Sequence, residues 1–399
     1  MIKVRILQNY ALYFYFFFVN FQELKLFGIE GFSVPKFTLL FYLCTILLDY
    51  KKFLQKRDYQ GAILPLILLF ILLTIINLLN INNVSQKIID ITLFQNLVIF
   101  WLLINHGRLD ISVMEKALFS LTLGSTLLAI FYNLDIGTSM DKGRVILFGD
   151  NSNITSIRMV ISTITLLYFI LKDRLKFGVI RWFLLLPVLL MAKLVASTGS
   201  RVGFISLVLS LFVLVLFSKT KHFYQKIGFV FIGSLFVLYL LRTILNEGII
   251  ARRLLQTAAN QDLSGREDFW SEILITASEN LFFGIGQSGY FMSFGNASPH
   301  NVIIEVLIYT GLVGVLFYLL FLYKIVIFAL KSFQRNDLIL PILLLSPIFG
   351  TILSGQILEM KLGWLLFAYI ISLYLSNLES SSTKNIQPNY FRSNMKIIK

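Results

Sequence analysis

Charged residues are scarce in this sequence: they make up 14% of its 399 residues, whereas 57% are hydrophobic. Proline is rare as well, with 7 residues against 38 phenylalanines. This balance excludes an ordinary water-soluble globular domain, which carries about 25% charged residues. We therefore expect the lipid bilayer to be the solvent of most of the chain.

Cysteine and internal repeats are also lacking. The only cysteine, Cys44, lies in an apolar stretch and excludes an intramolecular disulfide. No repeat of 20 to 50 residues and no linker rich in Pro or in Gly and Ser divides the chain. The net charge of +14 does not indicate a nucleic-acid partner, because there is no soluble domain on which a basic face could form. A single membrane domain is the expected organisation.

Long apolar runs are what the sequence has instead. Several approach the roughly 20 residues that cross a ~30 Å hydrocarbon core as a helix, whereas the alternating segments of a transmembrane β-barrel are not seen. We predict an all-α polytopic integral membrane protein, with residues 1–379 as one transmembrane domain and 380–399 as a polar cytoplasmic tail. The apolar stretch from Tyr10 to Val19 lacks a cleavage site and is predicted as the first span. About 12 transmembrane helices are expected, near 8–22, 33–48, 61–79, 88–105, 115–134, 154–171, 181–197, 202–218, 227–244, 300–323, 338–356 and 362–377.

The distribution of lysine and arginine predicts the orientation of these helices. With the N-terminus in the cytoplasm, most of the 35 basic residues fall in cytoplasmic loops, as the positive-inside rule requires. An even number of spans then places the C-terminus in the cytoplasm too. The largest hydrophilic segment, about 245–299, becomes an extracytoplasmic loop.

The basic residues in and beside this loop are all arginines, although lysine is common elsewhere. The planar guanidinium suits bidentate contact with phosphate or carboxylate better than an ammonium does. Alternatively, the arginines pair with the six carboxylates of the segment and fold it. The residues concerned are Arg242, Arg252, Arg253 and Arg266.

The loop ends in Ser298-Pro-His-Asn301, directly before an apolar run. Ser298 is expected to cap a helix whose first position is Pro299, which would place His300 and Asn301 in its first turn at the membrane surface. A helix N-terminus favours an anionic ligand. Histidine can accept a proton from a hydroxyl near neutral pH. The alternative is an interfacial histidine that only caps or packs.

Two further arginines are predicted on the same side of the membrane. Arg201 ends the very short turn Thr198-Gly-Ser-Arg201 between two spans, and Arg144 lies in a polar stretch that ends at Asn153. Structural snorkelling is the alternative for both. Arg158 and Lys193 fall within predicted spans, where a charge is costly, but a small shift of boundary would place either at an interface.

Motifs for metals and nucleotides give no positive indication. The sequence contains neither HExxH nor CxxC, and no metal or cofactor is predicted. The segment Gly284-Ile-Gly-Gln-Ser-Gly289 matches GxGxxG formally, but that fingerprint needs a strand before it and a helix after it within a βαβ unit. A glycine-rich turn is the better interpretation.

Taken in order, these features resemble the O-antigen ligase and Wzy-type polymerase family. The resemblance covers roughly residues 140 to 320. Each motif alone is weak, but their order around one large loop is fairly specific. They are Arg144 before Phe148-Gly-Asp-Asn-Ser-Asn153, Ser197-Thr-Gly-Ser-Arg201, Ser264-Gly-Arg266 with Trp270, Gly284-Ile-Gly286, and Pro299-His-Asn301 leading to Glu305 and Gly311-Leu-Val-Gly314.

The resemblance implies a glycosyltransferase with a GT-C-like arrangement of helices, acting outside the bacterial inner or plasma membrane. The donor would be a glycan on undecaprenyl diphosphate, transferred without a metal and with inversion. Arg266 and Arg201 would stabilise the leaving diphosphate, as preorganised cations can, and His300 would orient or deprotonate the attacking hydroxyl. The remaining candidates for contact with the diphosphate or sugar are Arg144, Asn301, Arg252, Arg253 and Asn153.

The acceptor separates the activities that remain open. A polymerase extends a lipid-linked repeat unit, and we favour it because the loop is short and the Ile, Asn, Lys and Phe bias resembles that of variable surface-polysaccharide loci. A ligase would use lipid A core or another surface molecule. A lipid-linked oligosaccharide flippase is the alternative from another class, although transporters usually show paired broken helices around a midplane cavity. A chain-length regulator and a flippase are further candidate partners.

Overall fold

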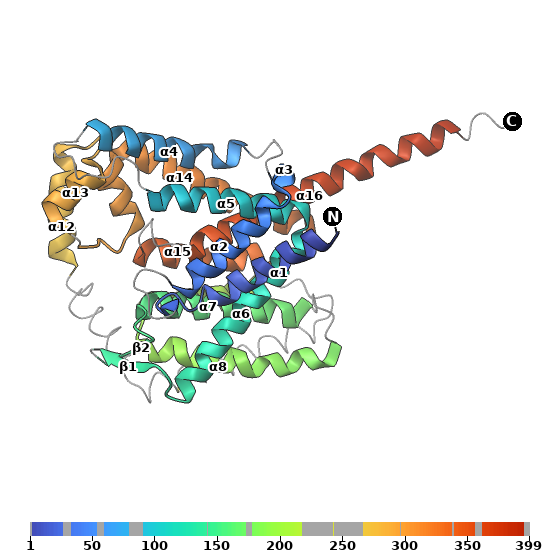
Figure 1. The fold of residues 1–399 in the computed structure, drawn as a ribbon, viewed down its shortest axis with the longest axis horizontal. Coiled ribbons are helices and arrows are strands. Elements are labelled where there is room, and N and C mark those ends of the chain that lie inside the picture. The colour runs from blue at the N-terminus through green and yellow to red at the C-terminus, as the bar shows by residue number, and fades with distance from the viewer. Residues whose placement is uncertain are drawn as a thin grey trace.

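A computed structural model describes residues 2–26, 33–53, 60–79, 91–141, 143–172, 178–217, 242, 266–295, 297–336, 339–355 and 361–394. Almost all regular structure in these residues is helical (Figure 1). The helices are α1 (Ile2–Phe18), α2 (Val34–Leu47), α3 (Tyr50–Phe53), α4 (Gln60–Leu79), α5 (Ile91–Leu109), α6 (Ile111–Asn133), α7 (Ser152–Lys172), α8 (Leu185–Ser197), α9 (Arg201–Phe217), α12 (Glu267–Glu279), α13 (Gly286–Phe294), α14 (Val302–Asn336), α15 (Leu340–Ser354) and α16 (Lys361–Asn394). A 3-10 turn, η2 (Gly178–Leu184), precedes α8.

Every span predicted from the sequence coincides with a helix, apart from 227–244. That span lies outside the described residues except for Arg242, as do the candidates Arg252 and Arg253. Six of the described helices are long and apolar enough to cross a membrane. The all-α membrane class is therefore confirmed, whereas the number of twelve spans and the GT-C-like arrangement stay predictions.

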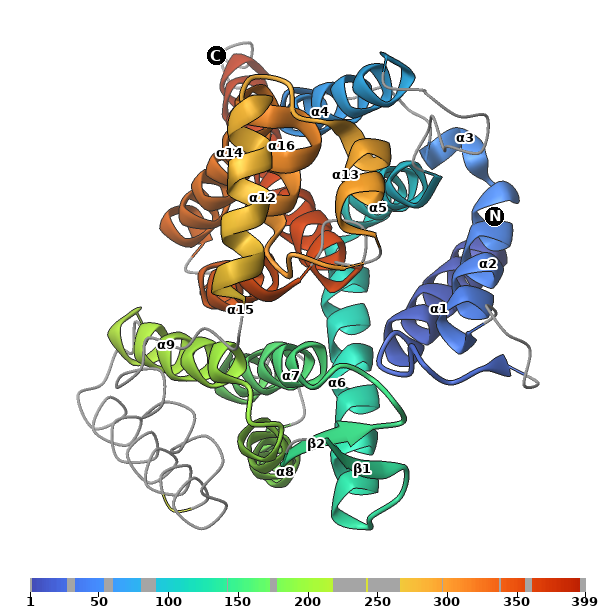
Figure 2. The ribbon, with the colours of Figure 1, turned by 90° about the vertical axis from the view of Figure 1, so that its left-hand side faces the viewer.

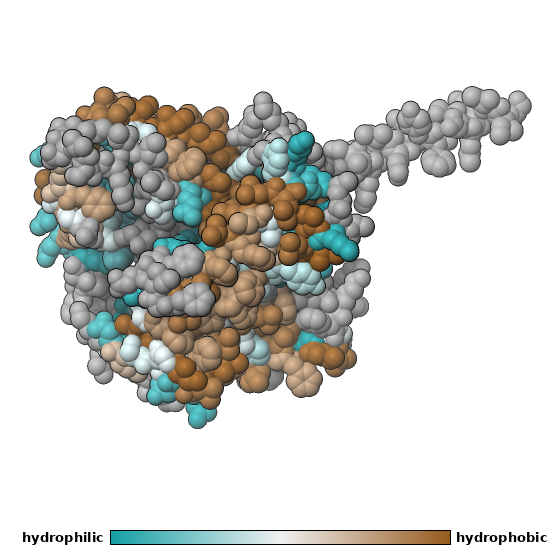
Figure 3. Space-filling view, in the orientation of Figure 1, coloured by the Kyte–Doolittle hydropathy of each residue, from teal (hydrophilic) through white to brown (hydrophobic). Residues whose placement is uncertain are grey.

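The spanning helices leave apolar faces exposed, as a bilayer requires. Apolar side chains cover α4 and much of the neighbouring surface in the space-filling view (Figure 3). On α4 they recur every three or four residues, which is the period of one helical face. The exposed residues of this face are Leu64, Ile67, Ile71, Ile75 and Leu78.

Small residues bring three helices close together near the functional candidates. A Cβ added to Gly203 of α9 would lie 1.9 Å from the Ser156 hydroxyl of α7, and one added to Gly350 of α15 would lie 2.7 Å from that of Ser206. The Ser206 and Ser346 hydroxyls each donate to the other's backbone carbonyl, over 3.5 and 3.1 Å. Small and hydroxyl side chains allow such close packing in membrane helices, and they hold α9 and α15 against the same helix, α7.

One end of the bundle carries the irregular structure. The N-terminus lies at the opposite end from α12, α13 and an antiparallel hairpin of β1 (Thr138–Asp141) and β2 (Arg144–Leu147), in which Asp141 pairs with Arg144 (Figure 1). In the view onto this end, α12 lies across α14, α13 lies in front of α5, and the hairpin lies beside α6 and α8 (Figure 2). All the described candidate residues belong to segments that meet at this end.

Helix α14 is broken at Gly311, where the backbone has φ 63° and ψ −164°. The chain segment 281–285 fills the break. The Leu312 and Val313 amides donate to the carbonyls of Leu281 and Phe282 over 2.9 and 3.2 Å, and the Ile285 amide donates to the Ile308 carbonyl over 2.9 Å. The glycine-rich turn predicted at 284–289 therefore approaches protein backbone.

Replacing Gly311 with alanine is expected to destabilise the protein by about 1–3 kcal/mol, the usual cost of overpacking. An added Cβ would lie 2.2 Å from the carbonyl carbon of Phe282, and the positive φ is itself unfavourable for alanine. Thermal unfolding in detergent measures the effect. Gly61→Ala is the control, since a Cβ there meets nothing within 4 Å; equal melting temperatures for both variants would contradict the prediction.

Candidate functional site

Arg144 joins the hairpin to the turn before α9. Its Nε donates to the Thr198 carbonyl over 3.1 Å, and its Nη2 donates to Asn153 Oδ1 over 2.7 Å. The predicted tight turn is confirmed, since α8 ends at Ser197 and α9 begins at Arg201. The structure thus unites three sequence candidates, Arg144, Asn153 and the Arg201 turn, beside the N-terminus of α7.

The loop before α7 and α7 itself are also joined by a buried ion pair between Asp150 and Arg158. Arg158 Nη1 donates to Asp150 Oδ2 over 2.6 Å and to the Asn20 carbonyl over 2.9 Å; Arg158 is 0% and Asp150 6% exposed. Asn20 continues the network by accepting from Ser125 over 2.8 Å. The pair fixes the loop before α7 to the end of α1. Burial identifies Arg158 as a structural anchor, a role that its sequence position left open.

Lys193, the other basic residue inside a predicted span, is less buried than Arg158. Its Nζ donates to Asn133 Oδ1 over 2.9 Å and lies 5.5 Å from the centre of the Tyr132 ring. The Tyr132 hydroxyl in turn donates to Ser197 Oγ over 2.7 Å. Lys193 therefore supports the end of α8 from a partly exposed position.

The segment before α14 differs from the helix start expected from the sequence. Ser298 does not cap α14: its hydroxyl accepts from the His300 amide over 3.1 Å, and the helix begins at Val302. Asn301 is the cap instead, since its Oδ1 accepts from the amides of Ile303 and Ile304 over 3.0 and 3.3 Å. Asparagine is among the strongest N-caps because its short side chain reaches these free amides. His300 precedes the helix.

The backbone of His300 is held in an unusual conformation. Its φ of 48° lies in the left-handed region, which residues other than glycine seldom adopt. Two neighbours hold the segment: Trp270 Nε1 of α12 donates to the Pro299 carbonyl over 2.8 Å, and the Tyr290 hydroxyl of α13 donates to the Ala297 carbonyl over 2.7 Å. Such strain is retained where the surroundings impose it, frequently at functional sites.

The charge environment of His300 links it to Arg266. Burial lowers the pKa of the His300 imidazole, and the positive charge of Arg266 lowers this pKa further. Arg266 stands at the N-terminal boundary of α12. The lowered pKa favours the neutral imidazole, which is the form that can accept a proton.

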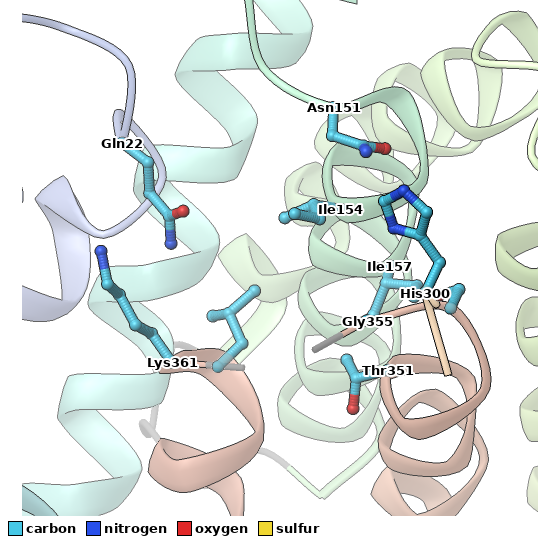
Figure 4. Close-up of a pocket in the computed structure, with 10 residues that line it drawn as sticks. Gln22, Asn151, Ile154, Ile157, His300, Thr351, Gly355 and Lys361 are labelled. Carbon is cyan, nitrogen blue, oxygen red and sulfur yellow. The ribbon is translucent and has the colours of Figure 1, made fainter. Parts of the chain in front are cut away.

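His300 lines a pocket with about 540 Å³ of empty volume, partly open to solvent. Figure 4 shows its imidazole beside Asn151 and Ile154 of the α7 region, with Gln22 and Lys361 across the pocket. Lys361 was not among the candidates predicted from the sequence, although the predicted topology places it in a short extracytoplasmic turn, where a charged residue is a signal for a site. The other lining residues are Ile157, Thr351, Ser354, Gly355 and Leu362.

Metal ligands do not cluster in the part of the chain that the structure describes. No group of three or more His, Cys, Asp or Glu side chains there could hold a metal ion. Lys361 lines the pocket, and Arg266 is close enough to His300 to lower its pKa; cationic side chains of this kind can bind and stabilise an anion such as a phosphate.

Apolar helices long enough to cross a bilayer, together with a pocket lined by His300 and Lys361, define a helical membrane protein with a candidate site. Residues 186–319 match the family described as O-antigen ligase. This match confirms the resemblance predicted from the sequence and supports the O-antigen ligase and Wzy-type family. Comparison with curated proteins gives no match.

The matched range contains Arg201, Arg266 and His300, whereas Arg144, Asn153 and Lys361 lie outside it. The family supports glycosyl transfer of the ligase or polymerase type, with lipid-linked glycans in a membrane as substrates. The match does not extend to the individual role of any residue.

Proposed function

We propose that this chain is a surface-polysaccharide polymerase, in which a glycan moves from undecaprenyl diphosphate to a sugar hydroxyl of a lipid-linked repeat unit. One observation carries the proposal: His300, whose pKa is lowered by burial and by the charge of Arg266, lines a pocket together with Lys361. This is the arrangement that transfer from a diphosphate donor needs. The site would face the outside of a bacterial inner or plasma membrane.

The proposed reaction assigns one task to each group. The acceptor oxygen forms a bond to the anomeric carbon with inversion, while the bond from that carbon to the diphosphate oxygen breaks. His300 takes the proton of the acceptor hydroxyl, which requires a neutral imidazole. Arg266 and Arg201, with Arg144 in support, stabilise the negative charge that develops on the diphosphate, so the transfer proceeds without a metal.

The reaction is expected to slow in acid, with a midpoint below pH 6.5. The pKa of His300 is lowered from 6.5 by burial first and by Arg266 second, so the imidazole stays neutral to lower pH and becomes protonated, hence inactive as a base, only below that value. The pH profile of kcat/KM measures the midpoint. Arg266→Gln removes the second cause and should move the acidic limb upward; an unchanged limb would contradict the assignment.

A single assay separates the candidate activities. The purified chain in liposomes is incubated with one defined undecaprenyl-diphosphate repeat unit and no other acceptor. A ladder of products is expected. Product that forms only when lipid A core or another acceptor is added would instead identify a ligase, and transbilayer movement without any elongation would identify a flippase.

The broken helix α14 is the feature closest to a transporter, since transporters use discontinuous helices to line a midplane cavity. In this chain the break is filled: the Leu312 and Val313 amides already donate to the carbonyls of residues 281 and 282. Those groups do not face a cavity, which supports an enzyme over a flippase.

A further inference from the structure

The segment 281–285, Leu-Phe-Phe-Gly-Ile, belongs to the loop predicted outside the membrane, yet it packs into the break of a spanning helix. A Cβ added to Gly284 would lie 2.6 Å from the Ile308 carbonyl oxygen. On its other side, the Gln287 amide donates to Asn77 Oδ1 of α4 over 2.9 Å. Two apolar helices, α4 and α14, therefore fix the depth of this segment.

The start of α4 provides a reference level. The apolar span of α4 begins at Gly61, and the Lys324 ammonium of α14 donates to the Gly61 carbonyl, although the apolar span of α14 continues to Gln334. A lysine side chain extends its ammonium toward the polar boundary of the membrane. Gly61 thus marks one edge of the hydrocarbon core, and the Lys324 ammonium reaches the same level.

Helix geometry then places the segment below the opposite edge. Asn77 follows Gly61 by 16 residues, which at ~1.5 Å per residue is a rise of ~24 Å. Gly311 precedes Lys324 by 13 residues, a rise of ~20 Å by the same measure. Both heights are smaller than the ~30 Å thickness of the core, and tilting of either helix would lower them further.

The side chains of the segment suit that depth. Leu281, Phe282 and Phe283 are 41%, 65% and 58% exposed. Backbone hydrogen bonds place Leu281 and Phe282 beside Leu312 and Val313 of α14. Leu312 and Leu316, one helical turn apart on α14, are 44% and 55% exposed, so the apolar residues of the loop adjoin an exposed apolar face of this helix.

Irregular backbone is tolerated at membrane depth only where protein covers it and satisfies its hydrogen bonds. Here the Leu281 and Phe282 carbonyls accept from α14, and the Gly284 and Ile285 amides donate to the carbonyls of Asn280 and Ile308.

We propose that the 281–285 segment re-enters the leaflet on the side of the site, and that Leu281, Phe282 and Phe283 contact the hydrocarbon chains of the bilayer. The contact anchors α12 and α13 to the membrane, and these helices hold the His300 segment through Trp270 and Tyr290. The inference depends on the membrane-spanning fold alone and stands whether or not the proposed reaction is correct.

Nitroxide accessibility tests this contact in the full chain. Cys44 is replaced by alanine, and single cysteines are introduced by Phe282→Cys, Phe283→Cys, Leu316→Cys and Glu279→Cys. The labelled proteins are reconstituted in phosphatidylethanolamine and phosphatidylglycerol vesicles that contain no lipid-linked glycan. Oxygen, which concentrates in hydrocarbon, is then compared with a water-soluble nickel chelate as the relaxing agent.

Labels at 282 and 283 are expected to match the label at 316, with high oxygen and low nickel accessibility. The exposed Glu279, at the end of α12, should give the opposite result. Nickel accessibility equal to that at 279 would place the segment in water and overturn the proposal. Low accessibility to both agents would mean burial against a second protein copy and would overturn it too. Two positions, 282 and 283, are labelled so that the test still holds if one of these variants misfolds.

Discussion

Replacement of His300 by asparagine is expected to reduce glycosyl transfer by about 10²–10⁴-fold, the usual contribution of a positioned general base. Asparagine cannot accept the proton of the acceptor hydroxyl, but it tolerates the left-handed backbone that His300 adopts at φ 48°. The variant therefore removes the chemistry without adding backbone strain. Single-turnover elongation of a defined lipid-linked repeat unit measures the effect.

The melting temperature of the His300→Asn variant serves as the control. Because the Trp270 and Tyr290 bonds hold backbone carbonyls and not the imidazole, the melting temperature of His300→Asn should equal that of the parent. Full elongation by a stable His300→Asn protein would remove His300 from the mechanism. A lower melting temperature would show that the side chain also supports the fold.

Replacement of Arg158 by methionine is expected to destabilise the protein by about 3–5 kcal/mol, the cost of breaking a buried pair from one side. Asp150, which is 6% exposed, would lose its partner at 2.6 Å. The loop that carries Asn151 and Asn153 would lose its tie to Asn20. Thermal or denaturant unfolding in detergent measures the loss.

Lys193→Met is the matched control, because this residue was the other basic side chain predicted inside a span and is partly exposed. It should cost far less than Arg158→Met. The double variant Arg158→Met with Asp150→Asn should recover part of the lost stability, since no unpaired charge stays buried. Equal melting temperatures for Arg158→Met and Lys193→Met would contradict the role of Arg158 as a structural anchor.

The spans were predictable because the bilayer imposes one simple requirement, an apolar run long enough to cross it. Helices α4, α7 and α15 follow the predicted ranges within a few residues. The start of α14 was not predicted correctly. Ser298 and Asn301 are both good caps, and only the packing of Trp270 and Tyr290 on residues 297–299 decides which one starts the helix.

The site was predictable in kind but not in full. The sequence indicated arginines and one histidine on one side of the membrane, and the structure brings Arg144, Asn153 and the Arg201 turn together. Lys361 and Gln22 were missed because they come from opposite ends of the chain and share the pocket only after folding. Arg252 and Arg253 lie outside the described residues, and their role stays a prediction.

By itself the sequence determined that this chain is a helical membrane protein with a resemblance to the O-antigen ligase and Wzy-type family, which the match over residues 186–319 supports. Hydrophobic run lengths and motif order are local properties of the chain. Tertiary structure decided what no local pattern encodes. It paired Arg158 with Asp150, lowered the pKa of His300 through burial and Arg266, and filled the break at Gly311 with residues 281–285. Burial and charge proximity depend on groups far apart in the chain, so they exist only in the folded molecule.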